Sequence, residues 1–203
     1  MKHIIFAVTG GSGAPIAKRV LELLLAADDV RVTMIMSDYA RDVFRAESGI
    51  DFGKTQGELA AGLAKHFSLN SRFELMDVRN MAARVSSGSA LNEGMIIAPC
   101  SMSTLGTIAN GITTNLVHRV ASVMLKEKRQ LILVPRESPY SPIHLKNMLE
   151  LAQIGVHVVP ATTAFYHKPQ TVGDMVDFVV MKVLDLAGVA HGLDKRWKGI
   201  EAD

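Results

Sequence analysis

The chain has 203 residues, of which 48% are hydrophobic, 5% are aromatic and 21% are charged, with a formal net charge of +2. This length suits a single domain, residues 1–203, with a substantial core. Charges of both signs are mixed along the chain, which argues against nucleic acid as a partner. The mean hydropathy of +0.20 is high for a soluble monomer, so we expect a homo-oligomer.

Cysteine content and hydropathy indicate the compartment. The one cysteine, Cys100, leaves no pair for an intrachain disulfide, which is typical of a reducing compartment. The apolar run near the N-terminus is too short for a secretory signal, and no segment is long enough to span a membrane. We therefore expect a cytoplasmic protein with no membrane partner.

The first predicted unit is a strand, a glycine-rich turn and a helix. His3–Val8 is apolar throughout, Thr9–Pro15 contains three glycines, and apolar residues recur at helical spacing from Ile16. Such a unit offers backbone N–H groups and a helix N-terminus to a phosphate. Ile16 stands where the dinucleotide fingerprint needs its last glycine, which favours a single phosphate over NAD. A tight turn without a ligand is the alternative.

A second strand is predicted at Val30–Met36, because apolar and other residues alternate there. Ser37 is placed to cap a helix over Tyr39–Ala46, which Glu47 closes. Gly49–Thr55 imitates a phosphate loop, but its glycines are one residue too close and no strand precedes it. We interpret that segment as an ordinary loop.

The next strand, Met95–Ala98, leads into a cluster of hydroxyl side chains within Ser101–Thr104, at the start of a predicted helix over Leu105–Asn110. Capping a helix explains one hydroxyl, but not three within four residues. Cys100 has no histidine or other base beside it in the sequence, so packing in the core explains it better than a role as nucleophile.

An unbroken apolar run at Leu131–Val134 is typical of a strand buried on both faces. Arg136 and Glu137 follow almost at once, before Ser141 and Pro142 start another helix. A cation and a carboxylate therefore leave the C-terminal end of a buried strand, where open α/β sheets bind ligands. From this stretch alone, two solvated loop charges are an equally good interpretation.

Further elements are a helix over Leu116–Leu125, a last strand at Val156–Val159 and a helix over Met175–Leu186, which the capping pattern Thr171–Asp174 begins. Five strands that alternate with helices predict an α/β fold. We expect one doubly wound, mostly parallel sheet in a Rossmann- or flavodoxin-like three-layer sandwich.

We place the core of the domain at residues 1–188 and a C-terminal tail at residues 189–203. Three predicted strand ends carry a Gly/Ser turn, a hydroxyl cluster and an Arg–Glu pair, and all three should lie at one edge of the sheet. The sequence holds no cluster with metal-ligand spacing. The residues alone predict a phosphorylated ligand or nucleotide, bound without a tight metal.

Seven segments, in order, resemble the UbiX-type flavin prenyltransferases. The likeness runs from about His3 to Trp197 and covers nearly the whole chain. The segments are TGGSGAP (9–15), SSGS (86–89), PCSMSTL (99–105), NLVHR (115–119), LKEKR (125–129), LVPRESPYSPIHLKNML (133–149) and FYHKPQT (165–171).

The resemblance implies an FMN site and a site for dimethylallyl monophosphate. The FMN residues would be Gly10, Gly11, Ser12, Ser37, Ser101, Met102, Ser103, Thr104, Arg119 and Arg136. The residues around the second substrate would be Ser89, Lys126, Arg136, Glu137, Tyr166, Lys182 and Trp197. Family members are metal-independent homododecamers whose sites are shared between subunits, and their product, prenylated FMN, is the cofactor of UbiD-type decarboxylases.

The reaction that the resemblance implies gives each of these residues a chemical role. Reduced flavin is the nucleophile, and cations such as Lys126 together with the Tyr166 hydroxyl would stabilise the departing phosphate. Trp197 and the flavin ring would surround the allyl cation. Ring closure onto the flavin requires loss of a proton.

For that proton, Glu137, Glu47 and the released phosphate are the candidate bases, with Ser12 as a relay. The predicted catalytic set is therefore Ser12, Glu47, Lys126 and Glu137.

This sequence departs from the family pattern at Lys182, commonly arginine, at Ser122, aspartate in many relatives, and at Met81, tryptophan in some. Two other functions stay open. A flavin-dependent cysteine decarboxylase would need a catalytic histidine, and only His66, outside the matching motifs, lies in roughly the right part of the chain. A non-catalytic FMN carrier for a partner decarboxylase would keep the FMN loops but would not need a second phosphate site.

Overall fold

The computed structural model describes residues 1–197 and 199. Its centre is one sheet of six parallel strands, in the order β3-β2-β1-β4-β5-β6. The strands are β1 (Lys2–Val8), β2 (Val30–Met36), β3 (Phe73–Met76), β4 (Gly94–Cys100), β5 (Gln130–Pro135) and β6 (His157–Val158). This is the Rossmann strand order, so the predicted doubly wound α/β fold is confirmed.

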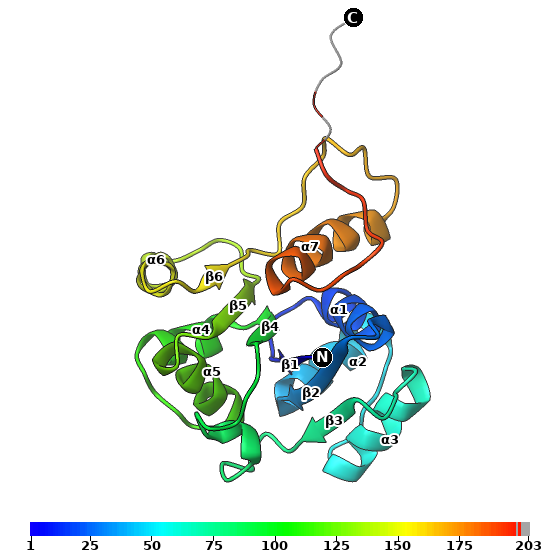
Figure 1. Cartoon of the computed structure of the whole chain (residues 1–203). Helices are drawn as coiled ribbons and strands as arrows, with labels where there is room; N and C mark the ends of the chain where they lie inside the picture. The colour runs from blue at the N-terminus through cyan, green and yellow to red at the C-terminus, as the bar shows by residue number, and fades with distance from the viewer. Residues whose placement is uncertain (198, 200–203) are drawn as a thin grey trace, which may run out of the picture.

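Helices cover both faces of the sheet (Figure 1). They are α1 (Ala14–Ala26), α2 (Asp38–Ser48), α3 (Gln56–His66), α4 (Met102–Ala109), α5 (Leu116–Lys126), α6 (Pro142–Gln153) and α7 (Val172–Ala187), with a 3-10 turn at Arg84–Ser86. One core packs α1, α2, α3 and α7 on one face, and a second core packs α4, α5 and α6 on the other.

The central strands are apolar on both sides because both faces are covered. Successive residues of β1 illustrate this, since Ile4 and Phe6 enter one core whereas Ile5 and Ala7 enter the other. The five predicted strands are all present. The sixth, β3, is a four-residue edge strand whose residues are only half-buried, so its sequence FELM lacks the long apolar run of a central strand.

The chain changes faces between β1 and β4, which are neighbours in the sheet. The helix that follows β1 packs in one core, whereas the helix that follows β4 packs in the other. At such a switch point the two loops diverge and leave a crevice outside the carboxyl ends of the strands, where ligands bind in this fold class.

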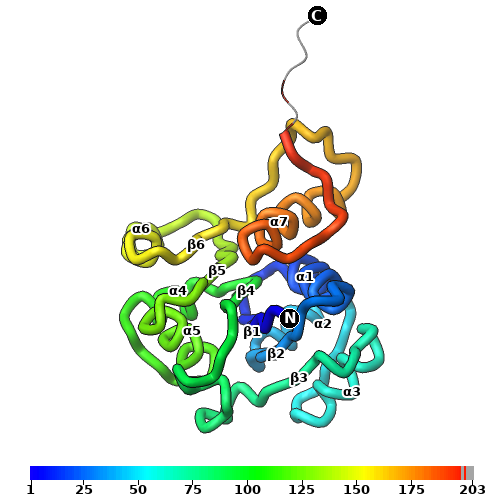
Figure 2. Tube along the Cα trace, in the orientation of Figure 1, coloured from blue at the N-terminus to red at the C-terminus, as the bar shows by residue number. Residues whose placement is uncertain are grey.

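The segments before and after α7 rise together away from the sheet (Figure 2). The described part of the tail contacts α7 and the segment before it. The Lys195 ammonium lies 2.6 Å from the carboxylate of Asp174 in α7, and the centre of the Trp197 ring lies 5.3 Å from that of the Tyr166 ring. The boundary between core and tail at residue 188 stays a prediction. No helix in the described part of the chain is long and apolar enough to cross a membrane.

Candidate active site

The loops after β1 and β4 are held together at the switch point. The Thr9 hydroxyl donates to the Pro99 carbonyl at 3.0 Å and accepts from the backbone N–H of Ser101 at 2.8 Å. Gly11 lies directly against the start of the second loop, since a Cβ built on it would be 3.4 Å from that Ser101 nitrogen, close to ordinary contact distance.

The N-terminus of α1 is occupied by a carboxylate. Oε2 of Glu47 accepts hydrogen bonds from the backbone N–H groups of Gly13 at 2.9 Å and Ala14 at 2.8 Å. Gly13 takes a φ of 137°, a conformation that favours glycine. Two of the donors that the sequence suggested for a phosphate are therefore bonded to Glu47.

Glu47 is held ionised. Partial burial works to raise the pKa of its carboxyl, but hydrogen bonds from the Ser12 hydroxyl and from the Gly13 and Ala14 N–H groups, with the charge of Arg136, outweigh it and lower the pKa. The structure thus brings three predicted residues, Ser12, Glu47 and Arg136, to one edge. Glu137 is exposed beside Arg136, and its Oε1 accepts from the Ser138 N–H at 3.1 Å.

The predicted hydroxyls begin helices at the same edge. Ser37 caps α2 by accepting from the Ala40 N–H at 3.2 Å. Ser101 caps α4 by accepting from the Thr104 N–H at 3.2 Å and donates its own proton to the Thr104 hydroxyl at 3.0 Å. Met102 is the first residue of α4 and is half-buried, and Ser103 is exposed beside it.

These elements enclose a cavity of about 520 Å³, which we call the carboxyl-edge cavity. Its lining is mostly apolar in area but rich in hydroxyl groups, and the N-termini of α4 and α5 both open on it, which suits a ligand with an anionic group. The lining residues are Thr9, Gly10, Ser37, Tyr39, Asp42, Val43, Ser101, Ser103, Thr104, Thr114, Asn115 and His118.

Sequence reasoning missed half of this lining: the residues from α2 (Tyr39, Asp42, Val43) and those at the start of α5 (Thr114, Asn115, His118). One signal for the second group was available. Asn115 precedes an apolar helix and caps it, accepting from the His118 N–H at 3.0 Å. The sequence could therefore have predicted a helix N-terminus at Asn115, but not that this terminus faces the cavity.

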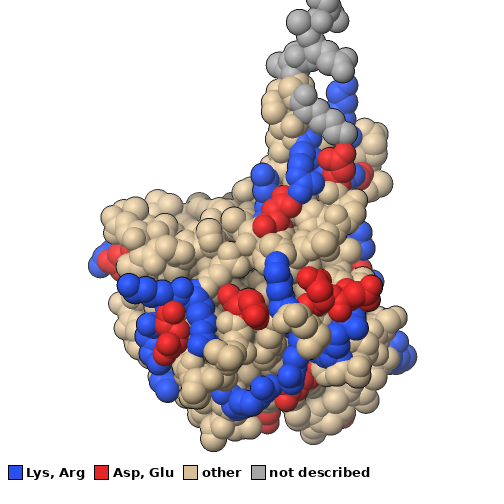
Figure 3. All heavy atoms as spheres, in the orientation of Figure 1, with Lys and Arg blue, Asp and Glu red and all other residues tan. Residues whose placement is uncertain are grey.

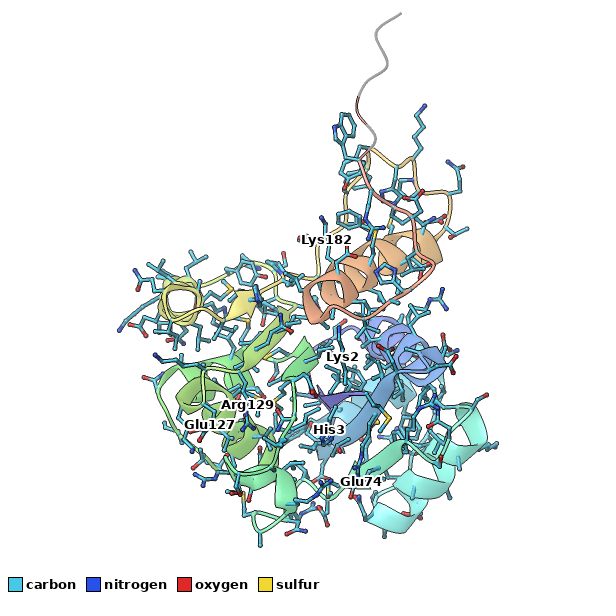
Figure 4. All side chains as sticks on the ribbon, in the orientation of Figure 1. Lys2, His3, Glu74, Glu127, Arg129 and Lys182 are labelled. Carbon is cyan, nitrogen blue, oxygen red and sulfur yellow. The ribbon has the colours of Figure 1, made fainter. Side chains whose placement is uncertain are left out.

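Ser89 and Lys126 lie at the opposite, amino-terminal edge of the sheet. Ser89 belongs to the loop that leads into β4, and Lys126 ends α5 just before β5. Arg129 ties the two segments together, donating to the carbonyls of Gly88 at 2.6 Å and Ala90 at 2.7 Å. Figure 4 shows Arg129 and Glu127, the ion-pair partner of Lys126, on this side of the molecule.

Because β4 has seven residues, roughly 20 Å separates the two edges. One chain therefore does not bring Lys126 to Glu47. Arg119 is directed toward the amino-edge loop as well, since its Nε donates to the Ser86 carbonyl at 3.1 Å.

Charges of both signs are interspersed on the face seen in Figure 3.

The remaining predicted residues gather on and above α7. The Tyr166 ring lies 5.9 Å from Phe178 and 5.3 Å from Trp197, both in edge-to-face geometry. Lys182 follows Phe178 by one helical turn, is exposed (Figure 4), and lines a mostly apolar groove of about 390 Å³ beside the last strand. No group of three or more potential metal ligands occurs within the described residues.

Comparison with known proteins identifies the family. The model of the Flavoprotein family matches residues 1–184. Flavin prenyltransferase UbiX of Methanothermobacter thermautotrophicus is 42% identical over 199 residues, covering 98% of this chain and 97% of that protein. The chain belongs to the UbiX-type flavin prenyltransferases.

Solved structures agree with that assignment. A dodecameric FMN-dependent UbiX-like decarboxylase from Escherichia coli O157:H7 has a TM-score of 0.87 and 40% identity, covering 97% of this chain and 100% of that one. AnUbiX, in complex with FMN and dimethylallyl pyrophosphate, has a TM-score of 0.84 and 36% identity, covering 98% of this chain and 99% of that one. The predicted family membership is confirmed.

Proposed function

We propose that this UbiX-type protein is a flavin prenyltransferase. It joins the dimethylallyl group of dimethylallyl monophosphate to reduced FMN, and the prenylated FMN then serves a UbiD-type decarboxylase. The observation that carries the proposal is the match over 98% of the chain to AnUbiX, a protein solved with FMN and dimethylallyl pyrophosphate.

The carboxyl-edge cavity fits FMN. Its volume of about 520 Å³ lies within the range of small-molecule sites. Two helix N-termini and the Ser103 hydroxyl offer donors for a phosphate, and Gly10 lines the cavity at a position where a Cβ would lie only 2.7 Å from Cβ of Tyr39. Reduced FMN, when bound, supplies the nucleophile, and the dimethylallyl group leaves its phosphate.

Glu47 and Ser12 accept and relay the proton that is released on ring closure. The lowered pKa keeps the Glu47 carboxyl ionised, so it is able to accept a proton. The Ser12 hydroxyl, which is hydrogen-bonded to Glu47, would act as a relay: it donates its own proton to Glu47 and takes up the one released from the flavin. Glu137, exposed in the loop that follows β5, is the alternative acceptor, and the released phosphate is a third.

The phosphate that leaves is stabilised by cations rather than by a metal. Arg136 lies at the carboxyl edge, and Lys182 and the Tyr166 hydroxyl come from the α7 region. Trp197 adds an aromatic surface beside Tyr166 for the allyl cation.

Ser89 and Lys126 reach this site from a neighbouring subunit. Within one chain roughly 20 Å of sheet separates them from Glu47 and the other residues at the carboxyl edge, whereas in a homo-oligomer the amino edge of one subunit is free to meet the carboxyl edge of another. The dodecameric state of the Escherichia coli relative supports this arrangement.

The test is an anaerobic incubation of the protein with chemically reduced FMN and dimethylallyl monophosphate, without added metal, followed by mass spectrometry of the extracted flavin. A flavin heavier by one isoprene unit is expected. A parallel reaction with dimethylallyl pyrophosphate tests the phosphate preference, and one without isoprenoid is the control. Unchanged FMN that is nevertheless bound to the protein would overturn the proposal.

A further inference from the structure

Two side chains at the start of α5 form a hydrogen-bonded pair on the wall of the carboxyl-edge cavity. The Oγ1 atom of Thr114 lies 2.9 Å from Nδ1 of His118. Both residues line the cavity, but Thr114 is exposed whereas His118 has only 7% of its surface exposed. The pair therefore joins a hydroxyl that a ligand can reach to an imidazole that is almost completely covered.

The imidazole of His118 is incompletely paired. Its Nε2 atom is buried and has no hydrogen-bond partner among the residues that the structure describes. Burial lowers the pKa of His118, so the ring is neutral at pH 7. A neutral imidazole carries one proton, on either Nδ1 or Nε2.

The burial decides between the two tautomers. A proton on Nε2 would leave an N–H donor buried without an acceptor, and orphaned buried N–H groups are rarer than unpaired acceptors. We therefore assign the proton to Nδ1, which donates to Thr114. The Thr114 hydroxyl, with one of its lone pairs engaged by that N–H, keeps its own proton free for an acceptor in the cavity.

The surroundings indicate which acceptor this is. The cavity receives the N-termini of α4 and α5, whose partial positive charges favour an anion. Its one acidic lining residue among those described, Asp42, is paired with Arg45 at 2.8 Å. An anionic oxygen is therefore the acceptor that this region suits.

We propose that the Thr114 hydroxyl donates a hydrogen bond to the phosphate of FMN and that His118 is a positioning residue that keeps this hydroxyl a donor. The inference rests on the proposed function, which supplies FMN as the ligand. It adds a phosphate contact from the residues that begin α5 to those that the Ser101–Thr104 cluster provides.

The experiment compares FMN with riboflavin, which lacks the phosphate, by titrating each flavin against the protein and following flavin fluorescence. Thr114→Val keeps the shape of the side chain but removes the hydroxyl, and Thr114→Ser restores it. A hydrogen bond to a charged group predicts about tenfold weaker FMN binding in the valine variant. Riboflavin binding should stay unchanged in both variants, and the serine variant should bind FMN like the original protein.

His118 is tested by rescue. His118→Leu removes the donor to Thr114, whereas His118→Asn places an amide N–H close to the position of Nδ1. The leucine variant should lose FMN affinity with little change for riboflavin, and the asparagine variant should recover most of the loss. A purely structural role would weaken both flavins together, and thermal melts of each variant report that case.

The outcomes separate this inference from the proposed function. If the unaltered protein binds no FMN, the proposed function fails. If it binds FMN but Thr114→Val leaves the ratio of the FMN and riboflavin dissociation constants unchanged, the hydroxyl does not contact the phosphate and the inference is overturned. A tenfold shift of that ratio, with rescue in the asparagine variant, supports it.

Discussion

Replacement of Glu47 by glutamine separates the charge of this side chain from its shape. In the structure the carboxylate accepts from two backbone N–H groups at the N-terminus of α1, at 2.9 and 2.8 Å, and from the Ser12 hydroxyl. Glutamine keeps one acceptor oxygen but no negative charge. The glutamine amide also does not accept a proton near neutral pH. The substitution should therefore affect both the stability of the protein and its catalysis.

The stability effect follows from the helix terminus. A carboxylate at a helix N-terminus stabilises by up to about 1 kcal/mol, and the exposure of Glu47 keeps the value in that range. Because the folded-state pKa of Glu47 lies below its ordinary value of 4.5, the stabilisation is fully present above pH 4.5. It is lost as the pH falls through the folded-state pKa.

Denaturant unfolding of the original protein and the Glu47→Gln variant measures this difference. At pH 7 the variant should be less stable by about 1 kcal/mol, and the gap should close once the carboxyl is protonated in the folded protein. Prenylation, followed by mass spectrometry, should slow by about 100-fold or more if Glu47 accepts the proton. Full turnover in a folded variant would refute the catalytic role, and a pH-independent stability gap would refute the electrostatic argument.

Other substitutions test the rest of the site. Glu137→Gln should still bind FMN by fluorescence titration but stall during prenylation, and full turnover would exclude Glu137 as a base. Lys182→Arg should lower the KM for dimethylallyl monophosphate, because arginine adds a second parallel hydrogen bond to phosphate; an unchanged KM would place Lys182 away from that phosphate. Lys126→Ala and Glu47→Gln, each inactive alone, should regain activity when the two variants are unfolded together and refolded as mixed oligomers. Mixtures that stay inactive would contradict a site shared between subunits.

The fold could be predicted because its central strands are buried on both faces. Runs such as Leu131–Val134 have no polar residue to blur them, and Ser141 with Pro142 marks the following helix start. By contrast, β3 at Phe73–Met76 is half-buried at the edge of the sheet, with Glu74 paired to Arg31 at 3.1 Å. Its sequence therefore carries both apolar and charged residues and looks like a loop.

The site residues that directly follow buried strands were predictable from the sequence. Those whose role depends on how a side chain or helix is oriented in the fold were not. Ser101 and Arg136 follow buried strands, so the sheet places them at one edge. Nothing in the sequence showed that Glu47 folds back onto the α1 N-terminus, since that contact joins residues more than thirty positions apart. His118 was equally hidden, because only the packing of α5 shows that its ring is buried beside the cavity.

The placement of Glu47 divides the carboxyl edge into two regions with different chemistry. A phosphate at the α1 N-terminus would need the same N–H groups that hold Glu47, and its charge would repel the carboxylate. The anion must then lie toward α4 and α5, where the helix N-termini line the cavity without a carboxylate bonded to them. Under the proposed function, the flavin would extend from that phosphate toward Ser12 and Glu47, which would place the proposed proton acceptor at the reactive end of the flavin and the phosphate contacts at the other end.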